Sequence, residues 1–151
     1  MKKSLLIALS FAFTMCASAQ LVAKMEVKED IPGICDKNEV YALMPYFEGQ
    51  VEALCPISET EIAKKLNAEV QFLKDNPKHK DKGMVDVIIN WNGELVQVSM
   101  GVKTKDPELD SQLMAVFKTL GNWESGKLNE KNVDSTQLFS FKIKKGILSF
   151  E

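Results

Sequence analysis

Two alternating apolar stretches joined by Asn92-Gly93 constrain the fold more than any other part of this sequence. The first runs from Val85 to Trp91 and the second from Leu95 to Val102, each with apolar side chains at every second position. Asn-Gly is the strongest short hairpin signal, because both central residues of a type I′ turn need a positive φ. The sequence therefore predicts a β-hairpin over 85–102. On its second strand, one face is expected to carry Val96, Val98, Met100 and Val102.

An amphipathic helix is expected before the hairpin and another after it. Ser58 and Glu61 have the spacing of a capping box, which satisfies two backbone N–H groups at a helix start. Asp106 followed by Pro107 is a helix N-cap with proline at the first helical position. The apolar stripes at helical spacing are Ile62, Leu66, Val70 and Leu73 in the first helix, and Leu109, Leu113, Val116, Phe117 and Leu120 in the second.

A last strand is expected over 133–144, where Phe139, Phe141 and Ile143 share one face. Ser140 and Lys142 lie on the other face, and lysine commonly protects an open sheet edge. The order helix, hairpin, helix, strand predicts an α+β domain, in which helices pack on a three-stranded antiparallel sheet. Because the hairpin strands pair with each other, the last strand joins one side of the hairpin and keeps its other edge free.

The N-terminus has the pattern of a secretory signal. Lys2 and Lys3 precede the apolar run from Leu5 to Met15, and Ala17 to Ala19 forms a small-x-small cleavage site. The run is too short for a bilayer, which needs roughly 20 apolar residues. We therefore expect a signal peptide over 1–19, cleavage after Ala19, and a periplasmic product without stable membrane insertion.

Cys35 and Cys55 are the cysteines that remain after this cleavage. An even pair in an oxidising compartment most often forms a disulfide, so we expect a bridge that supports an irregular N-terminal extension over 20–57. Two buried free thiols are the alternative. The spacing matches neither a zinc site nor a CxxC redox motif.

The composition argues against several functions. Removal of Lys2 and Lys3 leaves 17 lysines against 21 acidic residues, a net charge of about −4, and the chain has no arginine. Nucleic acids and phosphates favour the guanidinium fork, so no nucleic-acid partner is expected. His79 is the only histidine, and the acids beside Asp106 suit a helix N-terminus. We therefore expect no enzyme, no cofactor and no metal.

From Gly83 to Ile143 the chain resembles the C-terminal domain of the TonB energy-transducer family. The shared pattern is a G-x-V-x-V strand, an Asn-Gly turn, a second valine-rich strand, a D-P-x-L-D helix, a W-x-x-G-K turn and a final strand. The family's turn proline is replaced by Ser125. Motif positions fall on Gly83, Asn92, Gly93, Asp106, Pro107, Leu109, Asp110, Trp123, Gly126 and Lys127. The resemblance places a TonB C-terminal-like domain over 58–151.

The resemblance implies a protein-binding function. Family members add the box peptide of an outer-membrane transporter as a strand at their sheet edge, which implies a receiving edge from Ser135 to Lys142. The implied partner-binding residues are Ser135, Gln137, Leu138, Ser140 and Lys142. A homodimer through the same edge is left open. Energy transduction is not expected, because five scattered prolines form no long spacer and the signal resembles a cleavable one rather than an anchor.

Two alternatives stay open from the residues. Trp123, in the connection between the second helix and the last strand, is expected to pack into the core, and the competing interpretation is a ligand anchor. The competing function is a small ligand carrier or hydrolase that uses the region between Cys35 and Cys55.

Overall fold

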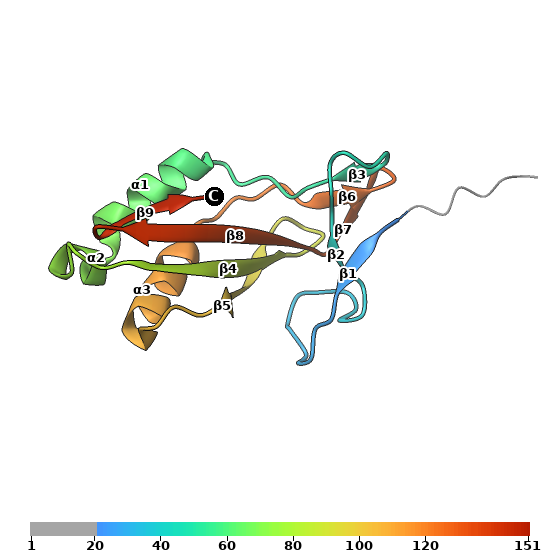
Figure 1. The fold of residues 1–151 in the computed structure, drawn as a ribbon. Coiled ribbons are helices and arrows are strands. Elements are labelled where there is room, and N and C mark those ends of the chain that lie inside the picture. The colour runs from blue at the N-terminus through green and yellow to red at the C-terminus, as the bar shows by residue number, and fades with distance from the viewer. Residues whose placement is uncertain (1–20) are drawn as a thin grey trace, which may run out of the picture.

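The computed structural model describes residues 21–151, so the expected signal peptide and its cleavage site lie outside the described residues. The described chain is an α+β fold in which one sheet of six strands packs against helices, and a second, three-stranded sheet stands at one end (Figure 1). The strands are β1 (Ala23–Met25), β2 (Val40–Ala42), β3 (Gln50–Val51), β4 (Asp81–Ile89), β5 (Leu95–Val102), β6 (Gly126–Leu128), β7 (Lys131–Val133), β8 (Ser135–Lys144) and β9 (Ile147–Phe150). The helices are α1 (Glu59–Glu69), α2 (Gln71–Asp75) and α3 (Pro107–Phe117).

Strands β4, β5 and β8 form the centre of the larger sheet. β4 pairs with β5 on one side and with the whole of Ser135 to Ile143 on the other, both antiparallel. The predicted hairpin is therefore confirmed, but its second strand is not regular. Ile88 pairs with Gln97 and Ile89 with Leu95, so Val96 lies in a bulge. The expected single face of β5 is wrong, because this bulge and a second one near Gly101 leave Val102 exposed, while Val98 and Met100 pack against the core.

The helix starts form as the capping patterns predict. The Ser58 side chain accepts the N–H of Glu61 while the Glu61 carboxylate accepts the N–H of Ser58, and Asp106 accepts the N–H of Glu108 at the start of α3. The first helix is interrupted at Val70, which adopts an extended conformation between α1 and α2. Both apolar stripes are buried nevertheless, which confirms the helical periodicity.

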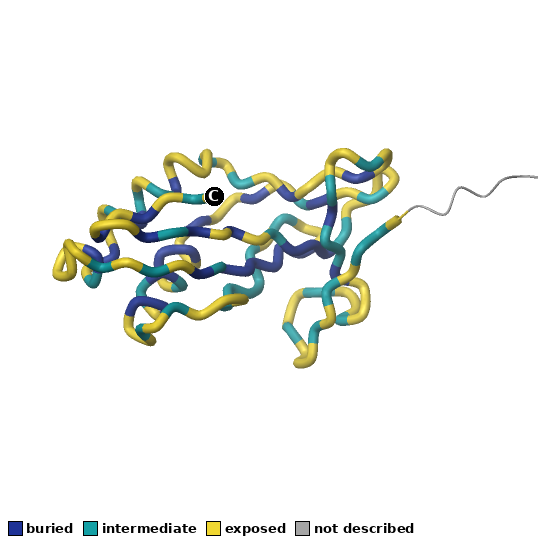
Figure 2. The backbone as a smooth tube through the Cα atoms, viewed as in Figure 1, coloured by how far each residue is buried: buried dark blue, intermediate teal, exposed yellow. Residues whose placement is uncertain are grey.

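The core lies between one face of the large sheet and the helices. Phe139, Phe141 and Ile143 of β8 point into it as expected, and they meet the apolar stripes of α1 and α3. Figure 2 shows the burial concentrated along the central strands, with exposed residues on the outer loops. No helix of residues 21–151 covers the other sheet face, and the buried carboxylate of Asp86 lies on it beside Gly101.

Trp123 is part of this core, as the packing interpretation predicts. Its side chain is 5 % exposed, its indole N–H donates to the carbonyl of Leu120 at 2.8 Å, and its ring meets that of Phe139 edge-on at 6.3 Å. The hairpin turn lies against the same connection, since a Cβ at Gly93 would collide with the carbonyl oxygen of Trp123. Gly93 also has a φ of +82°, so two constraints favour glycine there.

The expected three-stranded sheet with β8 at its edge is wrong. The chain continues past β8 through a two-residue turn at Lys145 and Gly146, whose φ angles of 54° and 72° suit a type I′ hairpin. The returning strand β9 then pairs with Phe141 to Lys144 of β8. At the other end of β8, β2 pairs in parallel through Tyr41 and Ser135, and β1 pairs with β2.

The outer edge of β9 is closed by a side chain rather than by another strand. Asn67 of α1 donates through its amide nitrogen to the carbonyl of Leu148 at 2.9 Å and accepts the Leu148 N–H at 2.8 Å. Both backbone groups of this buried residue are therefore satisfied, as a neighbouring strand would satisfy them.

The expected disulfide is also wrong, because Cys35 and Cys55 are both free thiols. Hydrogen bonds join the N-terminal extension to the sheet instead. The buried carboxylate of Asp134 accepts the N–H groups of Cys35 and Trp91 at 2.6 and 2.9 Å, and its own carbonyl accepts that of Tyr41. These bonds link the extension, the hairpin turn and β2 at one point before β8.

Candidate functional site

The outer side of β8 is covered at its two ends and open in the middle. β2 reaches only Ser135, and β9 begins to pair at Phe141, so no strand of the described chain lies beside residues 136–139 on this side. One further hydrogen bond, from the N–H of Glu151 to the carbonyl of Ser140, marks the β9 end of the opening. We call residues 136–140 the open stretch of β8.

The direction of the backbone groups in the open stretch follows from the pairs at its ends. The carbonyls of Asp134 and Ser140 both point away from β4, because they accept the N–H groups of Tyr41 and Glu151. Backbone groups alternate along a strand, so Leu138 also turns its N–H and its carbonyl away from β4. The N–H of Ser140 faces the same way. The open stretch therefore presents donors and acceptors that no strand of the described chain occupies.

A groove of about 290 Å³ lies along this stretch, and we call it the edge groove. Its walls are the chain that leaves β2, the start of α1 and the segment between β3 and α1. It is lined by Ala42, Leu43, Met44, Glu52, Glu59, Thr136, Gln137, Leu138 and Phe139. Leu138 is 55 % exposed, which is unusual for a leucine in the middle of a sheet, and its side chain lies on the helix-free face.

The charged residues that line the edge groove are both acidic. Glu52 follows β3, and Glu59 is the first residue of α1, and neither forms an ion pair within residues 21–151. Burial raises the pKa of Glu52, and the negative charge of Glu59 raises it further. The groove therefore carries two acidic side chains that form no ion pair within the described chain.

The structure divides the five predicted partner-binding residues. Leu138 and Ser140 lie in the open stretch, whereas Ser135 pairs with β2 and Lys142 pairs with β9 and binds Glu151. Gln137 lines the groove from the helix side, and its amide donates to the carbonyl of Ala53. The completely free edge expected from Ser135 to Lys142 is thus reduced to its middle.

Sequence reasoning missed the residues that shape this region from a distance. Asp134 is 3 % exposed and joins three segments, and Asn90 accepts the N–H groups of Asn92 and Glu94 while donating to the carbonyl of Gly33. Both residues are polar side chains at strand ends, a pattern typical of turns. That local signal does not show which distant backbone groups they bind.

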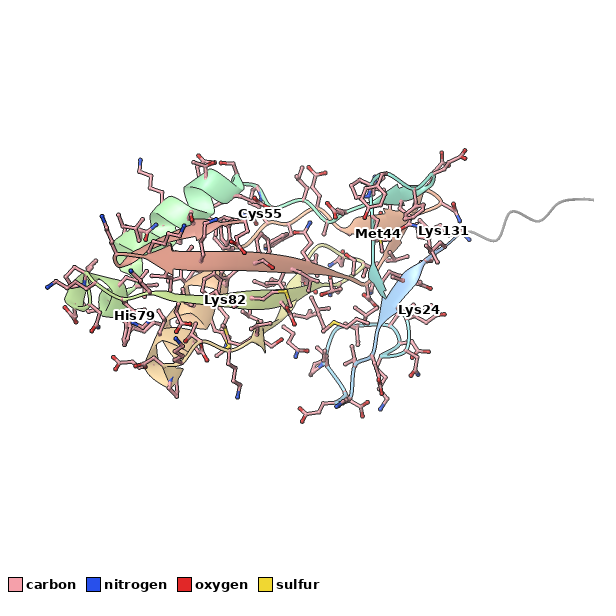
Figure 3. All side chains as sticks on the ribbon, in the orientation of Figure 1. Lys24, Met44, Cys55, His79, Lys82 and Lys131 are labelled. Atoms are coloured by element: carbon pink, nitrogen blue, oxygen red, sulfur yellow. The ribbon has the colours of Figure 1, made fainter. Side chains whose placement is uncertain are left out.

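The cysteines and the histidine are the described residues whose side chains most readily support catalysis. Burial raises the pKa of both thiols, and the charge of Asp134 adds to this effect at Cys35, so neither favours a thiolate. His79 lies near α2, apart from Cys55 (Figure 3). Within residues 21–151, no three histidine, cysteine or acidic side chains are placed to share a metal ion. In the same part of the chain, every helix is too short or too polar to span a bilayer.

Comparisons with protein-family models, with curated proteins and with solved structures found no match to this chain.

Proposed function

We propose that this chain is an exported, non-enzymatic protein-binding module that receives an extended peptide as an added strand along the open stretch of β8. The observation that carries the proposal is the pair of outward backbone groups of Leu138, with the outward N–H of Ser140, beside the edge groove. A peptide on this edge gains main-chain hydrogen bonds, and its alternate side chains give specificity, as in other cases of β-strand addition.

The length of the open stretch limits what can bind. From Thr136 to Ser140 the strand spans about 14 Å at roughly 3.4 Å per residue. It offers the carbonyl of Thr136, both backbone groups of Leu138 and the N–H of Ser140. A partner segment of about five residues is enough to pair with all four groups. At about 1 kcal/mol for each bond, and with the cost of ordering the peptide, the backbone alone supports weak and reversible binding.

The resemblance to the TonB C-terminal domain family supports the same mode of binding. In that family the ligand is the box peptide of an outer-membrane transporter, so a transporter peptide is one candidate partner. The placement in the periplasm rests on the expected signal peptide over 1–19, which lies outside the described residues.

The alternative, a ligand carrier or hydrolase, has less support. A hollow of about 480 Å³ beside Cys55 is large enough for a small ligand. However, the raised pKa of Cys55 does not favour a nucleophile, and no histidine lines this hollow. The uncovered strand is therefore the better-supported site.

A proline at position 140 tests the proposal with little change to the fold. Ser140 is exposed, its carbonyl keeps the bond from Glu151, and its N–H points away from β4. Ser140→Pro thus removes one outward donor, and Ser140→Ala removes the side chain but keeps that donor. We expect a bound peptide to lose about fivefold in affinity with the proline variant, the equivalent of one backbone hydrogen bond, and to be unaffected by the alanine variant.

Hydrogen exchange then locates the peptide directly. In the free protein, the amides of Leu138 and Ser140 should exchange faster than those of Phe139 and Phe141, which bond to β4. A bound peptide should slow the first pair selectively. Slow exchange of Leu138 and Ser140 in the free monomer contradicts the proposal, and so does protection confined to β5, the strand at the far end of the sheet.

A further inference from the structure

We propose that the peptide received by the edge groove is basic on both sides of a central apolar residue, a pattern of the form basic–apolar–basic in an extended segment. This inference rests on the proposed strand addition and adds the chemistry of the ligand to it. It follows from the two faces of β8 at the open stretch and from the charges that line each face.

The two faces of β8 differ sharply around Leu138. Leu138 and Ser140 point to the helix-free face, while Gln137 and Phe139 point toward the helices and the segment that carries Ala53. Side chains directly opposite each other on paired strands lie on the same face. The peptide residue opposite Leu138 therefore lies on the helix-free face, and its two neighbours point into the edge groove.

The side chain opposite Leu138 meets an exposed apolar side chain. Leu138 is more than half exposed, and on its other side it pairs with Asp86 of β4, whose side chain is buried. A β-branched or aromatic residue at this peptide position covers the exposed leucine and forms a favourable cross-strand pair. A charged residue at this peptide position would leave Leu138 exposed, and the charged group itself would lose part of its hydration.

The two neighbouring side chains meet carboxylates. Glu52 and Glu59 both line the edge groove together with Gln137 and Phe139, and no lysine lines it. Neither glutamate has an ion-pair partner within residues 21–151. Lysine or arginine at these peptide positions supplies the missing positive charge, and the aliphatic part of the side chain can cover Phe139.

The electrostatics of Glu52 agree with this arrangement. Burial and the charge of Glu59 raise the pKa of Glu52, which means that both destabilise its ionised form. A cation between the two carboxylates relieves that destabilisation and lowers the pKa of Glu52. Glu52 and Glu59 also line the adjoining hollow beside Cys55, where Lys127 lies, but Lys127 forms an ion pair with neither glutamate.

Three blocked peptides test the charge preference. They share the sequence Thr-Xaa-Val-Xaa-Thr, with lysine, glutamine or glutamate at both Xaa positions, and each is titrated into the full chain while amide shifts are followed by NMR. We expect the lysine peptide to bind on the order of tenfold or more tightly than the glutamate peptide at low salt, with glutamine between them. The difference should shrink as salt rises, because exposed charges are screened.

A double variant assigns the preference to the edge groove. Glu52→Gln with Glu59→Gln should bring the three affinities within about twofold of one another, while Glu69→Gln with Asp75→Asn, which changes the net charge equally elsewhere on α1 and α2, should leave the preference intact. Equal affinities for the unaltered protein, with shifts at Leu138 and Ser140, overturn the charge inference and leave strand addition standing. Absence of shifts at these amides with any peptide overturns both.

Discussion

Replacement of Trp123 by alanine should remove a large part of the stability of this fold. Trp123 is only 5 % exposed, and it lies where the chain passes from α3 toward β6 and β8. Emptying a large aromatic site typically costs about 3–5 kcal/mol. A domain of this size is stable by roughly 5–15 kcal/mol, so the variant should unfold at a much lower denaturant concentration.

A second variant separates the components of this loss. Trp123→Phe keeps a ring near Phe139 but removes the indole N–H that donates to Leu120, and it leaves a smaller void. The lost hydrogen bond costs about 1 kcal/mol, so we expect a total near 1–2 kcal/mol, clearly less than for alanine. Trp91→Ala is the matched control, because Trp91 is 48 % exposed, and its cost should stay below about 1 kcal/mol.

Urea unfolding followed by far-UV circular dichroism gives these free energies without relying on tryptophan fluorescence. The packing argument requires the order Trp123→Ala, then Trp123→Phe, then Trp91→Ala, from most to least destabilising, with similar m-values. If Trp123→Ala unfolds at the unaltered midpoint yet fails to bind a peptide that the unaltered chain binds, Trp123 is a ligand anchor and the packing argument is refuted.

Two further predictions concern titratable groups. Burial raises the pKa of Asp86 above its unfolded value of 3.8, so ionised Asp86 destabilises the fold, and its contribution to stability falls as pH rises through the window from 3.8 to the raised pKa. Asp86→Asn should therefore stabilise the protein at pH 7 but not at pH 3, and melting curves that show equal effects at both pH values contradict this. Free thiols at Cys35 and Cys55 predict that a thiol reagent labels both of these cysteines in the unreduced, denatured protein, with Cys35 labelled before Cys55 under native conditions because it is more exposed. Recovery of a peptide pair linked through Cys35 and Cys55, with no free thiol, would contradict this prediction and support the disulfide.

Local patterns predicted the local structure well. The caps at Ser58 and Asp106, the turn at Asn92-Gly93 and the inward face of β8 all depend on neighbours within a few residues, so the sequence carries their signals directly. The turn at Lys145 and Gly146 also depends on local sequence, and Gly146 is a turn signal, but it was not predicted. The strand that follows it, β9, is only four residues long, which is too short for a clear alternation.

What the sequence did not predict depends on contacts between distant segments. The parallel pairing of β2 with β8, the junction at Asp134 and the side-chain closure of β9 by Asn67 join residues far apart in the chain. The expected disulfide failed for the same reason, since counting cysteines gives their chemistry and not the geometry that a bridge needs. Leu138 and Ser140 were among the partner-binding residues that the family resemblance implied. Glu52 and Glu59 were not, because an irregular segment brings them to the groove.

The boundaries of the open stretch have a consequence for how the molecule behaves at high concentration. An unprotected edge normally invites copies of a protein to stack without limit, and this is the physical origin of fibrous aggregates. The open stretch of β8 is about five residues long and lies between β2 at one end and β9 at the other. A strand that binds there fills the whole stretch and presents only a short new edge. Beyond β9, Asn67 stops growth in that direction. This edge therefore accepts only a short strand, and the new edge that such a strand presents is equally short.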